Sequence, residues 1–220
     1  MFRNRRRGSG MPASVAARAG DGASVYQRVL GGDFAALDPR LRSYFGPIPP
    51  GAEGVGVGTF REAGLRARVL RPLFAILRMR RIAFAERGVD VPFDVRNIPE
   101  ADGALRGIRT FRFAGWPREM VDRMRVVDGR LIDRLGARGE LEVELAVRVV
   151  DGGLRLDSRR IALRLGGIRL PLPRVVAVSI REEACDDGTQ HVEARITAPI
   201  LGEIYGYAGA FTYGLRPASG

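Results

Sequence analysis

Apolar and polar residues alternate with a period of two along most of the chain from residue 82 onward. Such alternation is typical of β-strands that bury one face and expose the other. It predicts nine strands: Val91–Asn97, Ala104–Phe113, Met120–Val127, Arg130–Leu135, Glu140–Val150, Leu154–Leu165, Val175–Glu182, Gln190–Ala198 and Ile204–Tyr213. Asp-Gly steps at 102–103, 128–129, 151–152 and 187–188 separate several of these strands, which favours tight antiparallel hairpins.

The residues before this region predict short helices and one glycine-rich strand. Ser24 is a candidate N-cap for a helix over Val25–Leu30, and a second short helix begins after Asp33, restarts at Asp38-Pro39 and ends at Gly46. Glycines two apart in Gly54–Phe60 could indicate a phosphate-binding loop. The segment lacks the spacing and the Gly-Lys-Ser/Thr ending of such loops, so we interpret it as a strand whose glycines admit a close neighbour.

Residues Leu65–Arg81 are the strongest helical candidate. Five apolar residues share one face at helical spacing, opposite several arginines: Leu65, Val69, Leu73, Ile76 and Leu77. Pro72 either kinks this helix or lies in its first turn. We expect the apolar face to pack on the sheet. Peripheral contact with an anionic membrane through Leu65–Arg81 is the alternative.

Strands joined by tight turns, with no helices between them, argue against a parallel sheet. We therefore predict a mostly β protein: a strongly curved antiparallel sheet or β-barrel-like domain with short N-terminal helices and one covering helix. A single domain is expected over residues 23–215. Residues 1–22 are rich in Arg, Ala and Gly without periodicity, which predicts a disordered basic tail, and Met11 within it is a second candidate start.

The net charge of +11 could indicate a nucleic-acid partner, but its composition points elsewhere. All 36 basic residues are arginine, which together with abundant Ala, Gly and Pro is typical of a GC-rich genome. Acids in Glu140–Leu145 and arginines in Leu154–Leu165 also predict ion pairs between adjacent strands. We expect no specific nucleic-acid partner, only weak, salt-sensitive binding to polyanions.

Few residues offer familiar catalytic chemistry. The single cysteine and the single histidine, Cys185 and His191, flank a predicted hairpin turn. Such a turn is exposed to solvent, which favours neither a reactive thiolate nor a site that stabilises an oxyanion. No metal-ligand spacing, cofactor motif, signal peptide or run of 18 apolar residues is present. These patterns predict a cytoplasmic protein with no cofactor and no catalytic residue, and they do not indicate its oligomeric state.

Aromatic and arginine residues mark a candidate ligand site. Trp116, beside Arg112 and Arg118, lies at a strand junction where it could line a pocket mouth and hold an anionic head; a core or rim tryptophan is the alternative. Tyr205 and Tyr207 share one face of the last strand with Tyr213. If that face is inside, they supply apolar walls with hydroxyl groups. We expect Tyr207 to line the largest cavity, with Trp116 or Arg118 near its mouth.

Several C-terminal segments in one order carry a family resemblance: Gly152–Leu156, Gly166–Pro173, His191–Gly202 and Tyr205–Gly209. With Leu41–Phe45 and Asp128–Gly136, they resemble a bacterial family catalogued as domain of unknown function 4166, over roughly residues 24–213. Relatives often carry Glu-x-Trp-x-Arg on a mid-chain strand, where this chain has Leu105-Arg106-Gly107-Ile108-Arg109. The resemblance implies that any site using that acid and tryptophan is altered here, and it implies no particular activity.

These observations favour a non-catalytic module that binds a small, largely apolar ligand, with or without an anionic head, or a partner protein. An enzyme with a site inside the barrel, like small cyclases or isomerases, is the alternative. An enclosed cavity lined by Arg and Asp/Glu would favour the second reading over the first.

Overall fold

Eleven strands form one antiparallel sheet in the computed structural model, which describes residues 22–173 and 175–218. The strands are β1 (Ala52–Leu65), β2 (Arg87–Pro99), β3 (Leu105–Arg112), β4 (Pro117–Val127), β5 (Arg130–Leu135), β6 (Leu141–Val150), β7 (Gly153–Leu165), β8 (Ile168–Pro171), β9 (Ala177–Ala184), β10 (Gln190–Ala198) and β11 (Gly202–Pro217). The predicted mostly β fold is confirmed. The predicted tail, apart from Gly22, lies outside the described residues.

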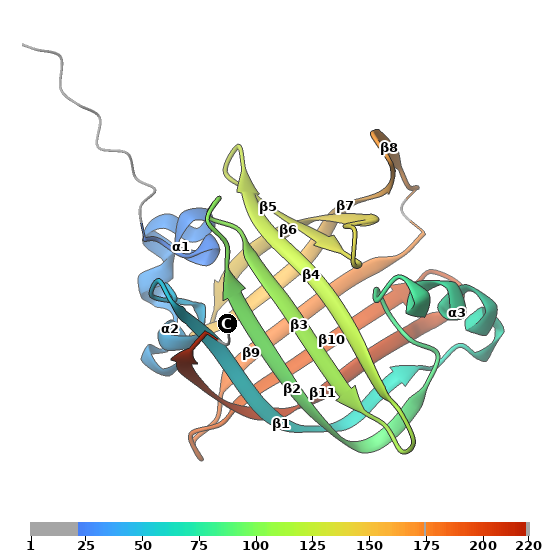
Figure 1. The fold of residues 1–220 in the computed structure, drawn as a ribbon, viewed down its shortest axis with the longest axis horizontal. Coiled ribbons are helices and arrows are strands. Elements are labelled where there is room, and N and C mark those ends of the chain that lie inside the picture. The colour runs from blue at the N-terminus through green and yellow to red at the C-terminus, as the bar shows by residue number, and fades with distance from the viewer. Residues whose placement is uncertain (1–21, 174, 219–220) are drawn as a thin grey trace, which may run out of the picture.

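Pairing of β6 with β7 closes the sheet into a barrel (Figure 1). The strand order is β6-β5-β4-β3-β2-β1-β11-β10-β9-β7, so every neighbour in the closed wall is antiparallel. β7 changes its second partner along its length, from β9 at Leu154–Asp157 to β8 at Ala162–Leu165. β8 therefore extends beyond the closed wall, as Figure 1 shows at the upper right.

The Asp-Gly steps form the hairpin turns that the sequence predicts. Asp128 and Gly129 have φ angles of 50° and 71°, and Asp151 and Gly152 have 51° and 78°. Positive φ at both central residues is the type I′ geometry, whose twist matches that of the flanking strands. These turns fix the registers of β4 with β5 and of β6 with β7.

Aromatic rings fill the barrel interior, and glycines make room for them. Phe60 stacks on Phe93 with centroids 3.7 Å apart and lies 4.9 Å from the ring of Tyr207. A Cβ at Gly56 of β1 would meet the side chains of Val95 and Phe211 at less than 3 Å. The glycine-rich segment is thus a strand beside bulky neighbours, as predicted, and not a phosphate loop.

Two short helices close one end of the barrel. α1 (Val25–Leu30) has Ser24 as its N-cap in a capping box, and α2 (Pro39–Phe45) has Asp38, with a 3₁₀ turn over Gly31–Ala36 between them. Polar contacts attach the helices to the strand turns at this end. The Asp38 amide donates to the Gly152 carbonyl at 2.8 Å, and Arg40 donates to the Cys185 carbonyl at 2.7 Å.

The other end is covered by α3 (Arg71–Met79), which follows a 3₁₀ turn over Arg68–Leu70. The predicted helix Leu65–Arg81 is too long, because Leu65 still pairs with Tyr205 as the last residue of β1. Pro72 lies in the first turn of α3. Phe74 is buried and stacks on Tyr205 at 5.4 Å.

The predicted buried face of this helix is wrong. Val69, Leu73 and Ile76 are exposed by 73%, 50% and 54%, whereas Leu70, Phe74 and Leu77 pack on the barrel. The apolar residues occupy two adjoining arcs of the helix surface, and the barrel end covers only one of them. Hydrophobic spacing alone did not indicate which arc would be covered.

Ion pairs join arginines to acids over the outer wall. Glu142 of β6 accepts bonds from Arg134 at 3.2 Å, Arg164 at 3.3 Å and Arg169 at 2.6 Å. The Arg164 pair crosses from β7 to β6, so the predicted use of arginines in cross-strand pairs is confirmed.

Gly209 allows β11 to approach β1, and a matched pair of variants tests this. A Cβ at Gly209 would lie 2.2 Å from the Thr59 carbonyl oxygen and 2.6 Å from the Phe60 Cα, whereas a Cβ at Gly214 on the same strand meets nothing within 4 Å. We expect Gly209→Ala to reduce the free energy of unfolding by about 2–4 kcal/mol and Gly214→Ala to leave it nearly unchanged. Urea unfolding measures both, and equal stabilities would contradict the close approach.

Candidate functional site

Four ionisable side chains occupy inward positions of the barrel wall among apolar neighbours. Arg109 of β3 lies opposite Val95 of β2 and Met120 of β4, both buried. Each of the three acids lies on the same face of its strand as the apolar residues two positions before and after it. These acids are Asp122 between Met120 and Met124, Asp133 between Leu131 and Leu135, and Glu182 between Ile180 and Ala184. All three carboxyl groups are buried. The barrel core therefore contains a cluster of charges.

Arg109 and Asp122 form an ion pair at the centre of this cluster. Gly107 faces Asp122 across β3 and β4, and a Cβ there would lie 2.7 Å from the carboxylate, so glycine provides the space for the acid. Burial lowers the pKa of Arg109, but the neighbouring groups, Asp122 first among them, together outweigh burial and raise the pKa well above its ordinary value. Arg109 is therefore permanently charged.

Asp133 lies next to this pair and is held neutral. Burial, and then the negative charge of Asp122, raise the pKa of Asp133 well above its ordinary value. Its Oδ1 atom has no hydrogen-bond partner among the described residues. The carboxyl group does accept a hydrogen bond from the Arg123 backbone, but an unpartnered buried oxygen such as Oδ1 is costly and unusual in a core built only for stability.

Glu182 is the acid nearest to ionisation at neutral pH. Burial raises its pKa to about 7, although Arg109 and a hydrogen bond from Gln190 both lower it. The Gln190 side-chain amide donates to Glu182 across β9 and β10, and both side chains are buried. Near neutral pH this carboxyl group can both accept and release a proton.

A small cavity adjoins Arg109 and Glu182. Its volume is about 30 Å³, enough for one or two water molecules. Its walls are largely aromatic and aliphatic, from both the strands and the helices: Tyr26, Tyr44, Phe60, Phe93, Val95, Met124, Leu156, Ile180, Val192, Tyr207 and Phe211. Burial raises the pKa values of Tyr26, Tyr44 and Tyr207, so all three hydroxyls stay protonated. The cavity thus combines apolar walls with one cation, one acid and three hydroxyl groups.

The tyrosines named from the sequence point inward, and Tyr207 reaches the cavity. Tyr205 and Tyr207 are buried, and Tyr207 lies against Phe60 and Phe111. Tyr205 donates to Met120 Sδ at 3.5 Å, nearer the α3 end. The space at Gly209 is taken by the β1 backbone and not by a ligand.

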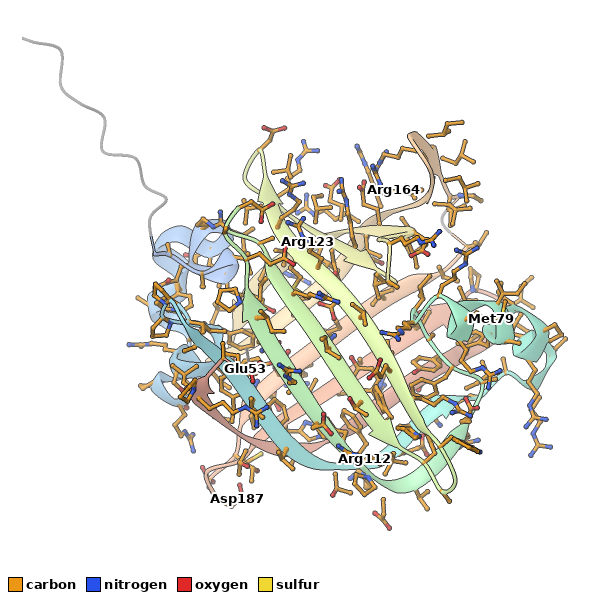
Figure 2. The ribbon with its side chains drawn as sticks, viewed as in Figure 1. Glu53, Met79, Arg112, Arg123, Arg164 and Asp187 are labelled. Atoms are coloured by element: carbon orange, nitrogen blue, oxygen red, sulfur yellow. The ribbon has the colours of Figure 1, made fainter. Side chains whose placement is uncertain are left out.

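The other three residues named from the sequence lie away from this cavity. Arg118 binds Glu86 at 2.7 Å near the α3 end of the barrel. Arg112 pairs with Asp94 on the outer wall, as Figure 2 shows for the labelled arginine. Trp116 is 72% exposed in the β3–β4 turn. These residues do not form one mouth with Tyr207.

The largest hollow is a different feature and does not include Tyr207. It is an open groove of about 960 Å³ between the β8 segment, the start of β9 and the end of β10. Four arginines and one acid line it, with Leu172, Val176 and three prolines: Arg130, Arg159, Arg160, Arg169 and Glu144. The expectation that Tyr207 lines the largest cavity is therefore wrong, because the aromatic core fills most of the space around Tyr207.

Two absences concern the rest of the described chain. No group of three or more His, Cys, Asp or Glu side chains within residues 22–173 and 175–218 could hold a metal ion. Among those same residues, no helix combines the length and the apolar character needed to cross a membrane. His191 lies opposite Glu183 in the β9–β10 pair, facing outward.

Comparison with known proteins identifies the family. A model described as "Domain of unknown function (DUF4166)" matches residues 37–211. The chain belongs to this DUF4166 family. It is also similar to "Uncharacterized protein YndH" of Bacillus subtilis (strain 168), with 28% identity over 201 residues, covering 86% of this chain and 96% of YndH.

The departure from the DUF4166 strand pattern now has a structural position. Gly107 stands where the pattern has tryptophan, beside the buried carboxylate of Asp122. The arginine of the pattern falls on Arg109, which the cavity adjoins.

The pH dependence of stability tests the state of Glu182. Because its pKa rises from 4.5 unfolded to about 7 folded, its contribution is fully present below pH 4.5 and is lost as the pH rises through about 7. The loss amounts to about 3 kcal/mol. We expect Glu182→Gln, which stays neutral, to flatten the curve of unfolding free energy between these pH values. Glu183→Gln, a control on the outer face, should keep the wild-type slope; equal slopes in all three proteins would contradict the assignment.

Proposed function

We propose that the barrel interior binds a small, largely apolar molecule whose anionic head is held by Arg109. The observation that carries the proposal is the position of Arg109, a charged group at the wall of a cavity whose other walls are mainly aromatic and aliphatic. Asp122 is its only hydrogen-bond acceptor among the described residues, which leaves further N–H groups for a ligand. Glu182 in its protonated form and the hydroxyls of Tyr44 and Tyr207 would supply further hydrogen bonds, while the Tyr26 hydroxyl already donates to Met124 Sδ at 3.4 Å.

The energetics of the polar cluster support a binding role. A buried ion pair usually stabilises a fold no better than well-packed apolar residues, and the unpartnered Oδ1 of the buried Asp133 adds a further cost. Proteins keep such exceptions mainly where function requires them. The cluster is therefore better explained by a ligand than by stability.

The small volume of the cavity requires a rearrangement on binding. Tyr26 and Tyr44 belong to α1 and α2, which close the barrel end with buried apolar side chains such as Phe45 as well as polar contacts to the strand turns, so opening would also have to separate this apolar contact. We propose that these helices move outward to admit the ligand, and that the vacated volume accommodates its apolar part. Such closing segments commonly gate enclosed sites.

Native mass spectrometry of the freshly purified full chain tests ligand binding. We expect the wild type to release a small organic acid, and the Arg109→Met/Asp122→Asn variant, which removes both charges together, to release none. Thermal unfolding with a panel of aliphatic and aromatic carboxylic acids gives a second readout, because a ligand of the native state raises the midpoint. The proposal fails if both proteins release the same molecule, or if the wild type releases none and no acid stabilises it.

A second candidate function is acid–base catalysis on the bound molecule, which the arginine and the acid at the cavity wall favour by the criterion stated from the sequence, and which requires the proposed binding and adds a proton transfer to it. Glu182 favours it, because a pKa of about 7 at a cavity wall is what a general acid or base needs at neutral pH. Isomerisation or cyclisation of a small apolar substrate would suit a site without metal or cofactor.

Deuterium exchange separates catalysis from binding alone. The released or stabilising acid is incubated with protein in D₂O, and its mass is followed. Catalysis predicts incorporation of deuterium at carbon with the wild type and a loss of at least about 100-fold with Glu182→Gln, while binding persists. Incorporation that is absent with the wild type, or unchanged in the variant, would leave only the binding function.

We propose that residues 23–215 form one domain that contains this site. We also propose that the protein acts in the cytoplasm. Support for the compartment is limited to the single free thiol, Cys185. Nucleic-acid binding receives less support, since many arginines are held by acids in the described part of the chain, as in the Glu142 cluster.

A further inference from the structure

The α3 end of the barrel exposes apolar side chains on three separate elements. On α3 and the turn before it these are Val69, Leu73, Ile76 and Met79, of which Met79 is labelled on α3 in Figure 2. Ile168 and Leu170 are exposed on β8, and Ile200 is 96% exposed at the apex of the β10–β11 turn. Exposed apolar residues gathered at one end of a molecule mark an interaction surface.

These elements are neighbours in space. The Arg66 amide, just before α3, donates to the Ile204 carbonyl at the start of β11, which joins α3 to the β10–β11 turn. The groove of about 960 Å³ joins that turn to the β8 segment, since Leu172 and Pro199 line it together. α3 and β8 both lie at the right in Figure 1, away from α1 and α2.

The two segments that carry most of these residues contain arginines and no acid, although Arg66, Arg78, Arg80 and Arg81 pair with acids of other segments and Glu203 follows Ile200. The segment 65–81 contains six arginines and no acid, and residues 158–181 contain no acid either. Arg68 and Arg71 are exposed beside the apolar arc and form no ion pair with any described residue. Arg159 and Arg160 likewise lack an ion pair in the described chain and line the groove.

We infer that this end of the barrel docks on the surface of an anionic lipid bilayer. Apolar side chains on separate tips can enter the interfacial region independently, without a partner of matching shape, and the arginines around them complement anionic headgroups. The groove beside Ile200, with Arg159 and Arg160, would hold a headgroup. The surface is independent of the proposed site inside the barrel.

Vesicle flotation with the full chain tests the inference. We expect binding to vesicles of phosphatidylcholine and phosphatidylglycerol in equal parts, and much weaker binding to phosphatidylcholine alone. Leu73→Asp and Ile200→Asp should each reduce binding to the mixed vesicles by roughly tenfold or more. Arg68→Gln/Arg71→Gln should reduce it by about fivefold per arginine.

Leu215→Asp is the matched control, because Leu215 is 49% exposed, close to the 50% of Leu73, and lies at the opposite end of the barrel. It should bind as the wild type does. Every variant keeps the five arginines of residues 1–20, so their attraction to the vesicles cancels in the comparison. Circular dichroism confirms that each variant is folded.

Three outcomes would overturn the inference. The full chain does not bind the mixed vesicles; Leu73→Asp and Ile200→Asp bind as well as Leu215→Asp; or the wild type is a dimer by analytical ultracentrifugation that Leu73→Asp dissociates. The last result would assign this surface to a second copy of the chain.

Discussion

Closure of the sheet through the β6–β7 pair is the constraint on which the rest of this structure depends. A closed wall of ten strands encloses more space than the eight-stranded barrels whose side chains just fill the interior. Phenylalanine and tyrosine rings fill most of this space, helped by glycines on neighbouring strands. Both open ends also need covers, and the helices before β1 and between β1 and β2 supply them.

The same closure raises the cost of every polar group that faces inward. Inward positions of a strand are normally apolar, because a polar side chain buried there loses its hydration. That cost is reduced only where a hydrogen bond or an opposite charge replaces the lost water. Arg109 and Asp122 offset part of that loss for each other, and Gln190 does so for Glu182. Asp133 instead loses its charge, because burial and the neighbouring Asp122 both favour its neutral form. The result is a core that has almost no net charge but contains several groups able to form hydrogen bonds.

The sequence predicts the wall of this protein better than its interior chemistry. Alternation and Asp-Gly steps located β5 and β10 to the residue, since local turn geometry determines register. Arg109 was not singled out, because it is one of three arginines on the same strand, and residue type alone does not distinguish it from Arg106 and Arg112. Their positions in the alternation of the strand distinguish them. Arg109 is two residues before the buried Phe111 and therefore faces inward, while Arg106 and Arg112 lie on the outward face. The covered arc of α3 could not be read in this way, because it depends on the shape of a barrel end assembled from distant strands.

The short strand β8 has a consequence for the protein's behaviour at high concentration. The wall strands are paired on both sides along most of their length, so the outer edge of β8, like residues 117–120 of β4, is a place where the described sheet could add a strand from another molecule. That edge is four residues long and ends at Pro171, with Pro173 two residues later. Proline has no backbone N–H to donate, and so short a ladder gives little register to a second chain. The short β8 edge and its prolines therefore oppose edge-to-edge aggregation at a place where the closed wall does not prevent it.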